Sequence, residues 1–113
     1  MARRRKHERK TLYHLYSHAR TRAWEHYGLV LSPERYTQYN TWIQQKHERV
    51  IPDWVESHTR LWCWIHDNDQ HYLVVYNTRL NGIATFLRPY ASERHDLFYG
   101  DDYDTADDEF FDG

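Results

Sequence analysis

The sequence lacks the features that stabilise secreted or membrane-embedded proteins. It contains a single cysteine, Cys63, so no disulfide can form within the chain, and we expect a reducing compartment. It has no apolar run approaching the ~20 residues that a membrane-spanning helix needs. The basic residues 1–10 are not followed by the apolar stretch of a signal peptide. These absences predict a soluble, cytoplasmic protein without membrane contact.

The net charge is also small, −2, but the charges are unevenly distributed. Residues 1–10 hold six Lys or Arg and one Glu, whereas residues 101–113 hold seven Asp or Glu and no basic residue. A chain of 113 residues suits one domain with a modest core. We therefore expect a flexible basic arm that is disordered or partly helical (1–10), a single domain (11–90), and a polar segment with an acidic tail (91–113).

Two segments have the apolar spacing of amphipathic helices. In residues 11–27, apolar side chains recur every three or four positions, and Gly28 can end the helix. In the second segment, Ser32 can cap the helix and Pro33 fits its first position. This second helix is expected to continue to about residue 47.

After Pro52 the apolar period changes from 3.6 to 2, which predicts strands. The expected strands are 59–66, 71–77 and 82–88, separated by turns that include an Asn-Gly signal. Two N-terminal helices followed by a three- to four-stranded meander predict an α+β fold. In this fold the helices pack on a small twisted antiparallel sheet.

A stripe of basic side chains follows the first expected helix. His14, His18, Arg22 and His26 are four residues apart, so they share one face. They form either the polar flank of a surface helix or a phosphate site, in which histidine moves a proton and arginine holds the phosphate charge. Zinc is less favoured, because no metalloprotease-type Glu accompanies the histidines and Cys63 has no second cysteine. We expect no metal site and no cofactor.

The expected strand 59–66 has two different sides. If Leu61, Cys63 and Ile65 face the helices, then the alternate residues face the other way. These are Arg60, Trp62 and Trp64. Two exposed tryptophans beside a basic residue can stack on nucleobases. Alternatively the acidic tail, a partner or a second copy covers them, because a large exposed aromatic patch seldom stays bare.

The acidic tail also allows two interpretations. It is either a solvated segment or an imitation of a nucleic acid strand. In the second case it occupies the protein's own basic groove or engages a basic host protein. The candidate partner-binding residues are Asp107, Asp108, Glu109, Phe110 and Phe111.

The order of several short motifs resembles a known enzyme grouping. These motifs are "S-HA-x-x-R-x-x-E" from Ser17, a capped second helix, "S-x-x-R" from Ser57, "VVYN" and "IATFL". Together, over residues 17–88, they are similar to small RelE/colicin D-type proteins of the barnase–EndoU–colicin–RelE grouping, many of them bacterial or phage proteins. The resemblance implies two helices on a small antiparallel sheet. It also implies metal-independent RNA cleavage, in which the 2′-hydroxyl attacks the neighbouring phosphate and a cyclic phosphate results.

The resemblance implies roles for particular residues. His18 matches the helix-borne histidine, Arg22 the arginine one turn later, and Thr85 the strand hydroxyl that hydrogen-bonds the phosphate. We therefore expect these three to be catalytic. The expected nucleic-acid-binding residues are Arg60, Trp62, Trp64, His14 and His26.

The chain also departs from the pattern of these enzymes. Glu25-His26 stands where relatives often have Glu-Arg, and the sheet region contains no lysine. The alternative function is therefore a non-catalytic phage protein that inhibits a host nucleic-acid-processing enzyme through its acidic tail or aromatic face. The expected partner is RNA, with a host protein or a cognate inhibitor as the second expectation.

Overall fold

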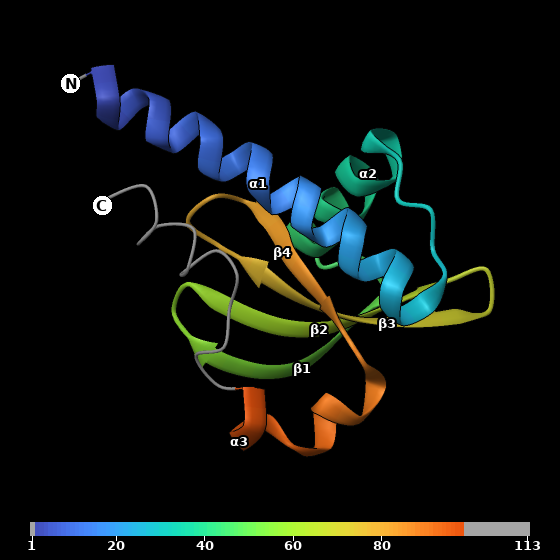
Figure 1. Ribbon diagram of the computed structural model, residues 1–113. Helices are drawn as coiled ribbons and strands as arrows, with labels where there is room; N and C mark the ends of the chain where they lie inside the picture. The colour runs from blue at the N-terminus through green and yellow to red at the C-terminus, as the bar shows by residue number, and fades with distance from the viewer. Residues whose placement is uncertain (1, 99–113) are drawn as a thin grey trace.

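The computed structural model describes the backbone of residues 2–98 and the side chains of residues 13–98. The expected acidic tail and its partner-binding residues lie outside this range. The described residues form two long helices, four strands and then two short helices (Figure 1): α1 (Ala2–Tyr27), α2 (Pro33–Gln44), β1 (Val50–Ser57), β2 (Arg60–Asp67), β3 (Gln70–Asn77), β4 (Gly82–Leu87), η1 (Pro89–Glu93) and α3 (His95–Phe98).

Helix α1 ends and helix α2 begins where the sequence predicts. Gly28 follows α1 with a left-handed φ of 65°, and the Ser32 hydroxyl accepts a hydrogen bond from the Arg35 amide at 3.1 Å. The backbone of residues 2–10 continues α1, so this helix begins before residue 11, where the apolar spacing starts. Helix α2 ends at Gln44, three residues before the expected boundary.

The four strands form one antiparallel sheet in the order β1-β2-β3-β4. The predicted α+β fold with two N-terminal helices is confirmed. Strand β1 was not among the strands expected from the sequence. Its pairing with β2 shifts register between Pro52 and Trp54 and again between Val55 and Ser57, so its apolar side chains do not alternate regularly.

The sheet has two covered faces, which we call the helix face and the tryptophan face. On the helix face, Ala19 and Ala23 of α1 and Tyr39 of α2 are buried with Val74 and Phe86. The tryptophan face carries a second apolar cluster: Trp62, Leu73, Val75 and Ala91, with Trp54, Trp64, Leu87 and Phe98 packed against it. Helices α1 and α2 therefore lie on one side of the sheet and the segment 89–98 on the other (Figure 1).

Side chains of α2 bind the outer edge of β4. The Tyr36 hydroxyl donates to the Ile83 carbonyl at 2.9 Å, and the Ile83 amide donates to Asn40 Oδ1 at 2.9 Å. An edge strand otherwise leaves such backbone groups without partners in the sheet. The two bonds therefore fix the start of β4 beneath α2.

Replacing Gly82 by alanine is expected to lower the free energy of unfolding by about 1–3 kcal/mol. A Cβ atom there would lie 2.7 Å from the Tyr36 hydroxyl, which is held by its bond to Ile83. Urea unfolding measures the loss, and the same change in a Tyr36→Phe background should be milder because the hydroxyl is gone. Equal losses in both backgrounds would contradict this contact as the cause.

Candidate functional site

The expected catalytic histidine is buried. His18 is only 9% exposed, and the pKa of its imidazole falls from 6.5 to about 3. Burial is the largest cause, and the nearby charges of Arg22 and His26 lower the pKa further. At neutral pH this ring is therefore uncharged and sealed from solvent, which is poorly suited to exchanging protons with a bound RNA.

The other two expected catalytic groups are not assembled with His18. Arg22 forms an ion pair with Glu25 on the helix surface, at 2.6 Å. Thr85 pairs with Val75 across the sheet and so shares its face, the tryptophan face, whereas α1 packs on the helix face. The Thr85 hydroxyl donates to the Phe86 carbonyl at 3.4 Å. The predicted anion site of these three residues is therefore not formed.

Two further expected RNA contacts lie on the same flank of α1. His14 and His26 are each partly exposed. The pKa of His26 is lowered by burial, by Arg88 and by Arg22, although Glu25 opposes the shift. On this flank the positive charges of Arg22 and Arg88 disfavour protonation of His26.

The expected aromatic face is covered. Trp62 is 1% exposed and Arg60 is 7% exposed, while Trp64 is partly exposed. Within the described residues the cover is the segment 89–98, because Trp62 clusters with Ala91 and meets the His95 ring edge-on at 4.9 Å. The prediction that Trp62 stacks on nucleobases is therefore wrong.

The two register shifts of β1 place two carboxylates on the tryptophan face. Asp53 and Glu56 occupy the shifted positions. Asp53 Oδ1 accepts the Trp64 indole N–H at 3.2 Å, and Glu56 Oε1 accepts the Trp62 indole N–H at 3.0 Å. Bulges commonly re-aim side chains in this way beside functional sites.

Each carboxylate also holds a basic side chain. Asp53 Oδ2 lies 3.0 Å from His95 Nε2, and Glu56 Oε2 lies 2.9 Å from Arg60 Nε. In the second pair the glutamate and arginine side chains are 4% and 8% exposed, whereas the His95 side chain is 29% exposed. We call these four residues, with Trp54, the bulge cluster. The cluster therefore combines a buried ion pair, Arg60–Glu56, with a partly exposed histidine, His95.

The orientation of His95 is fixed on several sides. Its ring is stacked on Trp54, with the centroids 4.3 Å apart and the planes 7° apart. Asp53, which holds its Nε2, is itself held by the Ser92 hydroxyl at 2.7 Å. An imidazole oriented by a carboxylate is the usual arrangement for proton transfer near neutral pH. Among residues 2–98, no three His, Cys, Asp or Glu side chains are grouped so that they could hold a metal ion.

Sequence reasoning missed Asp53, Glu56 and His95. The available signal is the string "DWVE" at residues 53–56, two acids three residues apart, before the tryptophans of β2. Regular alternation would place Asp53 and Glu56 on opposite faces, and only the two bulges bring them to the same one. His95 follows a 3-10 turn, which has no apolar period.

Comparison with known proteins gives no relative for this chain: no family model, no curated protein and no solved structure matches it. None of the helices in the described part of the chain has the length and apolar character needed to cross a bilayer.

Proposed function

We propose that the protein binds single-stranded RNA on the tryptophan face and cleaves it without a metal ion, using His95 to transfer the proton. One observation supports this most directly. The imidazole of His95 is oriented by Asp53 at 3.0 Å, is stacked on Trp54, and is partly open to solvent. The RNA chemistry expected from the sequence is retained, and His95 takes the role expected of His18.

Cleavage through the 2′-hydroxyl needs one group that removes or donates a proton and a cation that stabilises the phosphate. His95 supplies the first, with Asp53 as its positioning residue. Arg94, exposed and next to this histidine in the chain, supplies positive charge, although it also pairs with Asp96 at 3.1 Å. The buried Arg60–Glu56 pair acts behind Trp62 and holds the indole in place.

An exposed aromatic surface lies on the same segment. Tyr90 is 55% exposed, and its ring lies 5.8 Å from that of Phe98. Aromatic rings beside arginines favour single strands, whose bases can stack on them. This pair takes the stacking role that the sequence assigns to Trp62.

The test is cleavage of a short single-stranded RNA in the presence of EDTA. The wild-type protein should yield products ending in a cyclic phosphate, and an oligonucleotide with a single deoxyribose at the cleavage position should stay intact there. His95→Gln is expected to lower the rate about 100-fold, because general acid–base catalysis contributes on that order. His58→Gln is the control, since His58 is exposed in the turn between β1 and β2.

A wild-type rate as low as that of His95→Gln would contradict the proposed catalysis. Asp53→Asn should lower the rate less, and it should leave RNA affinity unchanged if Asp53 only positions the ring. An equal loss of affinity and rate would assign Asp53 to binding instead.

A second candidate function is favoured by the burial of the Arg60–Glu56 pair and by the bonds from Asp53 to Ser92 and His95. These contacts attach the segment 89–98 to the sheet, as a binding scaffold without catalysis would require. The protein would then inhibit a host nucleic-acid-processing enzyme. Two results would support this function over the first. The protein would bind RNA without cleaving it, and truncation after Gly100 would abolish inhibition of the host enzyme.

A further inference from the structure

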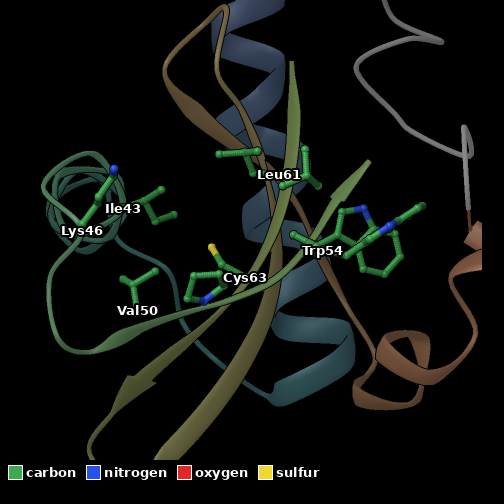
Figure 2. A pocket seen from close by; sticks show the side chains of 9 residues that line it. Ile43, Lys46, Val50, Trp54, Leu61 and Cys63 are labelled. Carbon is green, nitrogen blue, oxygen red and sulfur yellow. The ribbon is translucent and has the colours of Figure 1, made fainter. Parts of the chain in front are cut away.

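An apolar groove lies on the helix face, and Trp54 is the one member of the bulge cluster that lines it. Helices α1 and α2 cover β3 and β4, but between the end of α2 and strands β1 and β2 the face is hollowed, with a volume of about 410 Å³ (Figure 2). The lining residues come from α2 and the turn after it, from β1 and from β2: Ile43, Lys46, Val50, Pro52, Val55 and Cys63, with Leu61 and parts of Trp54 and Trp62.

The floor of the groove is apolar and carries no negative charge. Burial and, to a smaller extent, the charge of Asp53 raise the pKa of the Cys63 thiol to about 12, so the thiol is uncharged. None of the nine lining residues is acidic. At the rim, Val55 is 66% exposed, so its side chain can contact a bound molecule.

A single basic side chain, that of Lys46, lines the opening of the groove. Lys46 lies beside Ile43 at the edge of the groove (Figure 2) and is exposed. Its φ is 54°, at the position after the α2 cap that glycine usually occupies, and its amide donates to the Ile43 carbonyl at 3.2 Å. A lysine in this conformation costs about 1 kcal/mol relative to glycine. Strained backbone of this kind is often found at ligand sites.

We propose that this groove binds a small amphipathic anion, with its apolar body against Val55, Leu61 and Cys63 and its carboxylate or sulfonate on Lys46. The volume is that of a small-molecule site, whereas a stable protein partner needs a larger surface. The charge of Lys46 complements an anionic head, and no lining acid opposes it. The groove shares only Trp54 with the bulge cluster and contains neither His95 nor Asp53, so this proposal is independent of RNA cleavage.

The test uses two dyes of similar shape, the anion 1-anilinonaphthalene-8-sulfonate and the uncharged N-phenyl-1-naphthylamine. The wild-type protein should bind one molecule of the anionic dye with enhanced, blue-shifted emission. Lys46→Ala should weaken the anionic dye about fivefold, the scale of one solvent-exposed ion contact, and leave the uncharged dye unchanged. An equal effect on both dyes, or none, would overturn the role of Lys46.

Substitution of two exposed valines, one at the groove and one distant from it, tests where the dyes bind. Val55→Glu should abolish binding of both dyes, whereas Val30→Glu, at a valine 73% exposed in the loop between α1 and α2, should change neither. Equal loss in both variants would place the dye elsewhere and overturn the proposal. Near-UV circular dichroism confirms that each variant keeps its native packing.

Lys46→Gly separates ligand binding from stability. Because glycine prefers the left-handed conformation, this variant should unfold at equal or higher urea concentration than the wild type while losing affinity for the anionic dye. A parallel loss of stability and affinity would show that Lys46 serves only the fold, and would overturn the proposed site.

Discussion

Replacing Glu56 by alanine is expected to lower the free energy of unfolding by about 3–5 kcal/mol, the scale for breaking a buried ion pair. The Glu56 carboxylate lies 2.9 Å from Arg60 Nε and accepts from the Trp62 indole at 3.0 Å, and the Arg60 side chain is only 8% exposed. Its removal leaves the guanidinium charge in a site largely closed to water. Urea unfolding, followed by tryptophan fluorescence, measures the change.

The chain contains a matched control for this prediction. Glu25 and Arg22 form a pair at 2.6 Å, but their side chains are 45% and 37% exposed. Glu25→Ala should therefore lower stability by about 1 kcal/mol or less. Similar losses in Glu25→Ala and Glu56→Ala would show that burial does not govern the Glu56 pair. Replacing both Glu56 and Arg60 by leucine should recover much of the stability, because no buried charge is then left alone.

The second large effect concerns His18 and acid. Its pKa is about 3 in the folded protein, against 6.5 ordinarily. Between these values the unfolded chain binds a proton that the folded protein does not, so lowering the pH favours unfolding. The folded state should lose about 1.4 kcal/mol per pH unit below pH 6.5, or about 3 kcal/mol by pH 4. Above pH 6.5 this residue should have no effect on the slope.

Urea unfolding at a series of pH values isolates the contribution of His18. His18→Gln cannot take up the proton, so its stability should fall less steeply between pH 6.5 and pH 4 than that of the wild type. His58→Gln, at an exposed position, should follow the wild-type curve. If the His18→Gln curve runs parallel to the wild type, the buried imidazole is not the acid-sensitive group.

The helices and three of the strands could be predicted because their signals are local. The Ser32 cap, the left-handed Gly28 and the alternation in residues 59–66 each depend on a few neighbouring residues. Strand β1 could not be predicted in the same way, because Pro52 and two bulges interrupt its alternation.

The predicted site failed for a different reason. A four-residue spacing places His18 and Arg22 on one side of α1, but it does not determine whether that side meets solvent or the rest of the protein. His18 is buried there, whereas Arg22 pairs outward with Glu25. The Asp53–His95 contact joins residues 42 positions apart, so no local pattern indicates it.

The Tyr27 hydroxyl links the last two strands. It accepts from the Leu73 amide at 3.1 Å and donates to the Leu87 carbonyl at 2.6 Å, so an α1 side chain bridges β3 and β4 where Leu73 and Leu87 pair. The backbone hydrogen bonds at the start of β3 and the end of β4 are therefore satisfied only after α1 has packed on the sheet. We therefore expect the contact of Tyr27 with β3 and β4 to form late in folding. Tyr27→Phe should then accelerate unfolding more than it slows refolding.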